Sequence, residues 1–302
     1  MENLGGMSPE AHPVFVSRRR AFAMMAASAV TVSRARAESG EHRRIDVKLS
    51  EEFQDSGERN VLAVVSSVAH AIWKHCPRTV WTMPGFWVFR SSDGPITLHR
   101  HRADGRIAIG LTARKYFWSQ YAFQFAHEFC HALAGHSNDW HAAWLGNHGA
   151  SQWFEESLCE TASLFALQAL SADWARNPPF EKWREYAPRL SEYVCDRLAT
   201  AAARLPDASR FREWFDGQLG SLRESGSQRE KNLVVARELL PVFERCPGGW
   251  ESVTFLNRVT DRDPRKSFAK QLRDWERACP EEHRPFASGI AALFPYDAAE
   301  RV

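Results

Sequence analysis

The chain has 302 residues, of which 44% are hydrophobic and 25% charged, a composition that is ordinary for a globular protein. Its formal net charge of +2 comes from the first 37 residues, which hold five Arg and two Glu; the remainder carries 34 basic and 35 acidic side chains, a net charge of −1. This balance excludes a strongly basic surface, so we expect no nucleic-acid partner and no attraction to an anionic membrane.

Residues 1–37 have the features of an export signal. The basic stretch Ser17-Arg18-Arg19-Arg20 precedes an apolar run from Ala21 to Val32, and Ala35-Arg36-Ala37 has the small-x-small form of a signal cleavage site. Arg19-Arg20-Ala21-Phe22 resembles the twin-arginine signal of bacteria, and the alternatives are an ordinary secretory signal or a disordered tail. The apolar run is too short to cross a bilayer, so we expect no stable membrane span and a periplasmic or secreted protein.

The next part of the chain predicts one helix and a small sheet. Residues 38–50 are polar and predict a flexible lead-in, whereas 54–75 has the apolar pattern of a mostly buried helix. Short apolar and β-branched runs between turn signals predict strands, at 79–81, 86–90, 96–100 and 106–111. We expect the strand at 106–112 to be available for pairing with an extended peptide.

From residue 117 onward the pattern is helical. We expect a helix at 117–134, a polar loop at 136–152, a second helix at 153–172 and further helices after 173, separated by prolines. The predicted fold class is α+β: a small antiparallel or mixed sheet packs on the 117–134 helix and is followed by a mainly helical C-terminal lobe.

The 117–134 helix contains a metal-binding pattern. His127-Glu128-Phe129-Cys130-His131 fits H-E-x-x-H, and residues four apart lie on one helix face, so both imidazoles can point at one ion. Neutral imidazole suits zinc, and a catalytic zinc has three protein ligands and an open position for water. Glu128 is close enough to reach such a water. The alternative is a helix with two surface histidines.

The third ligand has to come from another part of the chain. The longer pattern H-E-x-x-H-x-x-G-x-x-H would need Gly at 134 and His at 137, where the chain has Ala134 and Ser137. The second helix offers Glu156, and Glu160 shares its face one turn later, where a carboxylate can orient a ligand histidine. Alternative ligands are Glu155, about 100° around the helix, and the loop histidines His136, His141 and His148.

The stretch Trp153-Phe154-Glu155-Glu156-Ser157-Leu158-Cys159-Glu160 resembles the third-ligand helix of the gluzincin metallopeptidases, the peptidase MA-like clan of thermolysin and the aminopeptidases. The resemblance covers about residues 115–170. It implies that Glu156 is a zinc ligand and that Glu160 accepts a hydrogen bond from a ligand histidine; Glu155 stands where the family often has Asn. The family also uses a Tyr or His as oxyanion donor, for which the candidates are Tyr116, Tyr186, Tyr193 and His148.

These features together predict a zinc metallopeptidase that acts on a peptide or protein substrate. We expect an export signal at 1–37, a zincin-like catalytic core at 38–172 and a helical lobe at 173–302. Glu128 would act as general base toward a zinc-activated water and then protonate the leaving amine. The alternatives are a non-catalytic zinc-binding protein of the periplasm and a zinc hydrolase that does not act on peptides. The oligomeric state and the cleavage specificity are not predicted.

The six cysteines give no metal knuckle, because none of them forms a C-x-x-C pair. They are Cys76, Cys130, Cys159, Cys195, Cys246 and Cys279. Two of them flank proposed zinc ligands, namely Cys130 and Cys159. We expect these two to be small buried residues that pack the two helices against each other.

Overall fold

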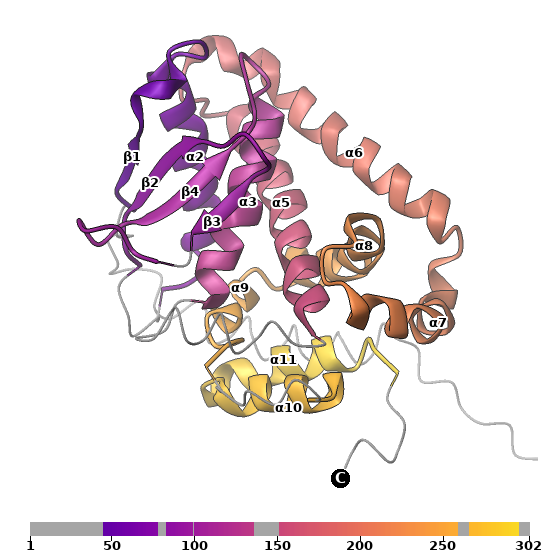
Figure 1. Ribbon diagram of the computed structural model, residues 1–302. Coiled ribbons are helices and arrows are strands. Elements are labelled where there is room, and N and C mark those ends of the chain that lie inside the picture. Colours follow the sequence, from indigo (N-terminus) through magenta and orange to yellow (C-terminus); the bar gives the residue numbers. More distant parts are fainter. Residues whose placement is uncertain (1–44, 78–82, 99, 136–150, 259–265, 296–302) are drawn as a thin grey trace, which may run out of the picture. The chain divides into compact units, whose positions relative to one another are not determined.

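The computed structural model describes residues 45–77, 83–98, 100–135, 151–258 and 266–295, and its fold class is α+β, as predicted (Figure 1). The sheet and its helices come first: β1 (Val47–Leu49), α2 (Glu58–Trp73), β2 (Phe86–Arg90), β3 (Ile96–Leu98), β4 (Ile107–Leu111), α3 (Trp118–Gly135) and α5 (Gln152–Trp174). Helices follow: α6 (Ala187–Arg204), α7 (Phe211–Glu224), α8 (Arg229–Arg245), α9 (Gly249–Val253), α10 (Phe268–Ala278) and α11 (Arg284–Ala291). Short 3-10 helices lie between them: η1 (Glu51–Phe53), η2 (Glu181–Tyr186), η3 (Ala208–Arg210) and η4 (Glu281–His283).

The sheet is mixed and has the strand order β1-β2-β4-β3. The pairs β1–β2 and β2–β4 are parallel, and β3 pairs antiparallel with β4. Two predictions are therefore wrong. The lead-in at 38–50 contains β1, and β4 is paired on both sides, so the strand at 106–112 has no free edge for a peptide. The strand expected at 79–81 lies outside the described residues.

The sheet packs on α3 through aromatic side chains. The Phe86 ring of β2 lies 5.4 Å from the Phe129 ring and 6.0 Å from the Phe125 ring of α3, and all three residues are fully buried. The side chains of β4 are buried along its length. The prediction of a small sheet against the H-E-x-x-H helix is confirmed.

Helix α5 lies in the interior, in contact with α2, α3, α6 and α8. From 153 to 167 every residue is buried except Glu156. Its small hydroxyl residues donate to carbonyl oxygens one turn back, as Ser157 does to Trp153 at 2.7 Å and Thr161 to Ser157 at 2.7 Å, so their polar atoms are satisfied inside the helix. The accessible position of Glu156 is therefore an exception that requires a reason.

An aromatic cluster holds the start of α5 against the last third of the chain. Its members are fully or almost fully buried: Trp153, Phe154, Phe215, Phe268 and Phe294. The closest pair is Trp153 with Phe268 of α10, at 4.6 Å between ring centroids. The residues at 155 and 156 thus extend from a helix end whose direction is set by distant aromatic side chains.

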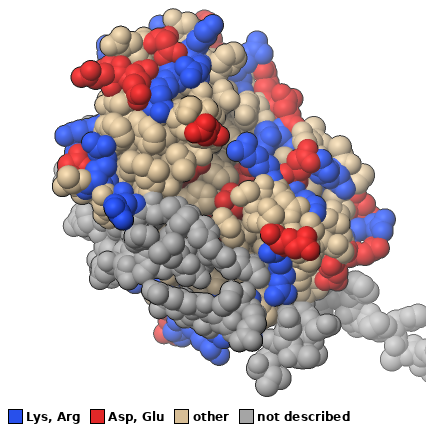
Figure 2. Space-filling view, viewed as in Figure 1, with Lys and Arg blue, Asp and Glu red and all other residues tan. Residues whose placement is uncertain are grey.

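The boundary that we predict between the core and the helical lobe, at 172/173, falls in the last turn of α5. The described residues all belong to one compact unit, Gly40–Val302. Within the described ranges no helix combines the length and the apolar character needed to cross a membrane. Acidic and basic side chains are interspersed on the face shown in Figure 2.

Candidate metal centre

Helix α3 presents both histidines on one partly accessible line of residues. Of its residues only Gln120, Phe123, His127 and His131 are not buried, and their spacing of three, four and four places them on one helix face. We call these four residues the α3 stripe. The two imidazole centroids are 5.1 Å apart. The predicted placement of His127 and His131 on one face is thus seen in the structure.

Glu156 of α5 lies opposite the two histidines. Its Oε2 is 3.2 Å from His127 Nε2 and its Oε1 is 3.7 Å from His131 Nε2. Two ligand atoms of a tetrahedral zinc, each 2.0–2.1 Å from the ion, are separated by about 3.3 Å. The spacing and the chemistry of these three side chains therefore fit one zinc ion, and Nε2 would be the ligand atom of both imidazoles.

Glu155, the alternative ligand, lies on the other side of the His131 ring. Its Oε1 is 2.7 Å from His131 Nδ1, and its Oε2 accepts a hydrogen bond of 2.8 Å from Asn257 Nδ2. A carboxylate in this position holds the proton on Nδ1, which leaves Nε2 free for a metal. Asn257 is 102 positions from Glu155, and no sequence pattern indicates the contact.

Glu160 is buried and accepts a hydrogen bond from Arg197 Nη2 of α6 at 3.4 Å. Its negative charge also acts on His127, where it favours the protonated imidazole. The carboxylates described in hydrogen bonds with the two histidines are those of Glu155 and Glu156, whereas the hydrogen bond described for Glu160 is accepted from Arg197. The Arg197 guanidinium also lies over the Phe123 ring, 5.1 Å from its centroid, so α6 closes this side of the centre.

Glu128 faces the sheet and makes no described contact with Glu156. The Thr97 hydroxyl of β3 lies 2.8 Å from Glu128 Oε2 and also 2.8 Å from the Glu128 carbonyl oxygen, so it can donate to either. Glu128 is only 4% exposed, and its charge acts on both His127 and His131. It is thus an acid held next to the proposed ligands without taking their place.

The titration behaviour of the cluster reflects its mixture of imidazoles and carboxylates. Burial alone would lower the pKa of His131, but the Glu155 and Glu156 carboxylates outweigh it and raise that pKa to about 10. Burial would likewise lower the pKa of His127, and its hydrogen bond to Glu156 makes the net shift upward. Burial would raise the pKa of Glu156, but the two histidines lower it to about 2. Protons on the imidazoles therefore supply the positive charge that a bound metal cation would otherwise supply to the carboxylates.

Cys159 is a further donor that the sequence prediction did not include. One ligand atom each from His127, His131 and Cys159 lie within 4.8 Å of one another. Burial and the nearby Cys130 thiol raise the pKa of the Cys159 thiol well above its usual value, whereas the Glu156 carboxylate is already ionised. Metal binding by Cys159 would therefore require loss of a proton, and binding by Glu156 would not. Both cysteines are fully buried, as predicted, and neither forms a disulfide.

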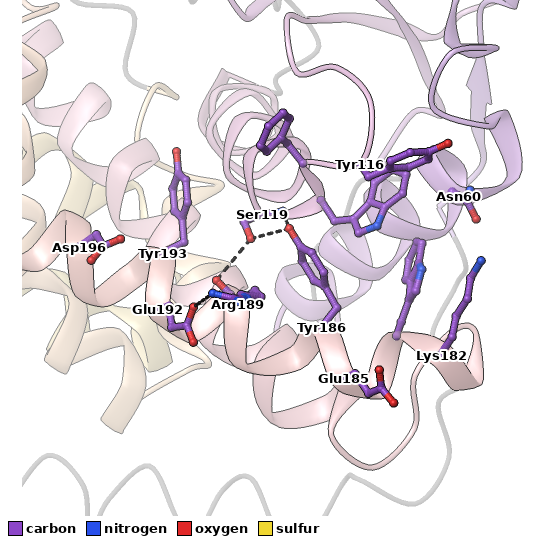
Figure 3. Close-up of a pocket in the computed structure, with 13 residues that line it drawn as sticks. Asn60, Tyr116, Ser119, Lys182, Glu185, Tyr186, Arg189, Glu192, Tyr193 and Asp196 are labelled. Atoms are coloured by element: carbon purple, nitrogen blue, oxygen red, sulfur yellow. Dashed lines mark hydrogen bonds and ion pairs between the residues drawn. The ribbon is translucent and has the colours of Figure 1, made fainter.

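The remaining sequence candidates are placed as follows. His136, His141 and His148 lie outside the described residues. Tyr116, Tyr186 and Tyr193 line a cavity near the start of α3 (Figure 3). The Tyr193 ring packs 5.5 Å from the ring of Phe123, which lies one turn before His127, and Tyr193 is thus the tyrosine of the three with a described contact to the α3 stripe.

Comparison with models of protein families, with curated proteins and with solved structures finds no match to this chain. Its function is therefore inferred from the side chains described above.

Proposed function

We propose that the chain is a zinc-dependent hydrolase of peptide bonds, in which His127, His131 and Glu156 hold the ion. The observation on which this depends is the convergence of both imidazole Nε2 atoms on Glu156, the single accessible side chain in the buried stretch 153–167. The gluzincin-like sequence pattern supports the same three ligands. Buried helices rarely contain several acids without a partner or a function, and α5 has three within six residues.

A zinc ion in this centre would lower the pKa of a bound water toward about 7 and polarise a substrate carbonyl. Glu128 is the base in this proposal: it takes a proton from the attacking water at a carboxylate oxygen. It then delivers that proton to the nitrogen of the leaving amine. The Thr97 hydroxyl, 2.8 Å from Glu128 Oε2, restrains the direction of the carboxylate. Glu155 keeps the proton of His131 on Nδ1 throughout.

The edge of the sheet supports a peptide as the substrate. Among the described strands β3 has a neighbour on one side only, which is β4. Its outward side chains are apolar and exposed, with Ile96 at 44% and Leu98 at 40%, while Thr97 points inward to Glu128. A peptide that added to this edge would make main-chain hydrogen bonds and pass beside the base.

Measurement of zinc content and of cleavage of a mixed peptide library, for the wild type and Glu128→Gln, tests the proposal. Because Glu128 is not a ligand, Glu128→Gln should keep its zinc, while activity falls by about 10²–10⁴-fold or more. Glu213→Gln, the same change at an exposed residue of α7, is the matched control and should change neither property. Equal cleavage by wild type and Glu128→Gln would reject the mechanism.

The two alternatives give other results in the same experiment. A non-catalytic zinc protein would contain zinc and cut no peptide. A zinc hydrolase of another class would cut no peptide but would hydrolyse simple esters, and Glu128→Gln would abolish that activity.

Export is a separate proposal, because residues 1–37 lie outside the described residues. We infer from the signal-like sequence that the protein is periplasmic or secreted. Replacement of Arg19-Arg20 by Lys-Lys should block translocation by the twin-arginine route. Normal amounts of the double variant in the periplasm would exclude that route, and a mature N-terminus far from Glu38 would exclude the predicted cleavage site.

A further inference from the structure

A cavity of about 780 Å³ lies between the start of α3, η2 and α6 (Figure 3). Its volume is in the range of about 300–1,000 Å³ that is typical of ligand pockets. Aromatic side chains form much of its wall: Tyr116, Phe117, Trp118, Trp183, Tyr186 and Tyr193. The proposed metal ligands do not line it, and the proposed function does not use it.

Several polar groups in the wall of the cavity have partners within the protein. The Tyr186 hydroxyl accepts a hydrogen bond from the Ser119 N–H at 3.2 Å and is 3.1 Å from the Ser119 hydroxyl. Arg189 pairs with Glu192 at 2.8 Å. Two aromatic side chains of the wall are largely exposed, Tyr116 at 68% and Phe117 at 62%, and the charged side chains of Lys182, Glu185 and Asp196 complete the lining. A large apolar or aromatic side chain is the ligand that exposed aromatic faces bind best.

The two exposed rings are held in position by the segment between β4 and α3. Gln124 of α3 accepts hydrogen bonds of 3.0 Å from the backbone N–H groups of both Thr112 and Ala113. Lys115, directly before the rings, has φ of +53°, which is a sparsely populated conformation for a residue with a side chain. The surrounding structure therefore imposes the backbone that presents Tyr116 and Phe117, as is common at ligand-binding positions.

The cavity and the metal centre lie along the same side of α3. Ser119 is in the cavity wall, Phe123 follows it one turn later against Tyr193, and His127 lies one turn further on. The eight helical steps from Ser119 to His127 span roughly 12 Å of helix. An extended peptide covers this length with about four residues, at roughly 3.3 Å per residue.

We propose that this cavity is a distal substrate subsite, which binds an aromatic or other large apolar side chain about four residues from the scissile bond. That the bound ligand is a substrate rests on the proposed function. That the cavity binds a ligand rests on Tyr116 and Phe117. The protein would then act as an endopeptidase that binds its substrate in an extended conformation. Peptides too short to reach the cavity should be poor substrates.

Peptides of equal length with one Phe moved along an Ala/Gly background test the subsite. The kcat/KM of zinc-loaded protein should be highest when the Phe is about four residues from the cut, on one side only. Tyr116→Ala and Phe117→Ala should each reduce that preference by about tenfold, the effect typical of an aromatic contact in a binding site. Leu62→Ala, which removes an exposed apolar side chain of α2 that does not line the cavity, is the matched control and should keep the preference.

A binding measurement separates this inference from the proposed function. Fluorescence anisotropy measures the dissociation constant of the uncut Phe peptide from zinc-loaded Glu128→Gln. This constant should be larger for the double variant that also has Tyr116→Ala. Cleavage that does not depend on the Phe position would overturn the subsite and leave peptide hydrolysis intact. Binding that depends on Tyr116, without cleavage by wild type, would support the site and reject the hydrolase. Neither cleavage nor binding would overturn both.

Discussion

The neighbouring acids Glu155 and Glu156 offer a direct test of the proposed metal centre, because they lie on opposite sides of the His131 ring. Glu156 faces both Nε2 atoms, at 3.2 and 3.7 Å, whereas Glu155 contacts only the Nδ1 side of His131, at 2.7 Å. Exchange of each for Gln preserves the shape of the side chain and removes its charge. The two variants should therefore lose zinc affinity to different extents.

The expected magnitudes follow from these contacts. Structural zinc sites bind with about 10–16 kcal/mol through four ligands, so one ligand contributes roughly 2.5–4 kcal/mol, or about 100- to 1,000-fold in affinity, and Glu156→Gln should lose about this much. Removal of an orienting carboxylate costs about 10- to 100-fold, which we expect for Glu155→Gln. Asn257→Ala, which only frees the second oxygen of Glu155, should cost less than either.

Competition between the protein and a chromophoric chelator at pH 7 measures these affinities, and circular dichroism of the metal-free variants checks that they fold. A larger loss in Glu155→Gln than in Glu156→Gln would reverse the two assignments. No loss in either variant would show that the third ligand is another residue, and Cys159→Ser would then identify whether the buried thiol takes that place.

Three further predictions concern protons and stability. Since the pKa of His131 is about 10 without metal, zinc binding at pH 7 should release at least one proton and tighten as the pH rises. Calorimetry in buffers of different ionisation enthalpy measures this release, and a value near zero would contradict the prediction. Thr97→Val should lower the free energy of unfolding by about 1–3 kcal/mol, because it leaves a buried carboxylate oxygen without its donor, and it should also lower kcat. Urea titration measures the first effect and steady-state kinetics the second. An unchanged kcat would show that Thr97 has no part in the mechanism. Burial would raise the pKa of Asp274, but Lys266 and Lys270 outweigh it and lower that pKa. Asp274→Asn should therefore lower the free energy of unfolding by about 3–5 kcal/mol near pH 7. The difference from wild type should persist above the unfolded-state pKa of about 3.9 and disappear as the pH falls through the lower folded-state pKa. Urea titrations over this pH range measure it, and a difference that stays constant down to about pH 2 would contradict the prediction.

The sequence predicted those features that depend on local periodicity. The helices at 117–134 and 153–172 are present as α3 and α5 with small shifts at their ends, because their apolar positions repeat with the period of a helix. The strands at 86–90, 96–100 and 106–111 correspond to β2, β3 and β4 for the equivalent reason. The same periodicity placed His127 and His131 on one face.

The features that the sequence did not predict depend on contacts between distant residues. Val47–Leu49 has only three residues in a polar segment, and it is a strand because β2 pairs with it. The central position of β4 depends on the strand order, which no local pattern contains. The partners of the three acids, Thr97, Arg197 and Asn257, are separated from them by 31, 37 and 102 positions. A helical pattern shows which face is buried but not which residue lies against it.

The aromatic cluster at the start of α5 also determines when the centre can form. Trp153 packs on Phe268 at 4.6 Å and on Phe294 at 6.1 Å, so the helix end that bears Glu156 is supported by residues made more than a hundred positions later. A ribosome-bound chain that has emerged only as far as α5 has the two histidines and the glutamate but not these supports. Contacts of such long range form late in folding. Under the proposed function, zinc would therefore be bound only after the chain is complete, and a protein truncated after α5 should not retain the ion.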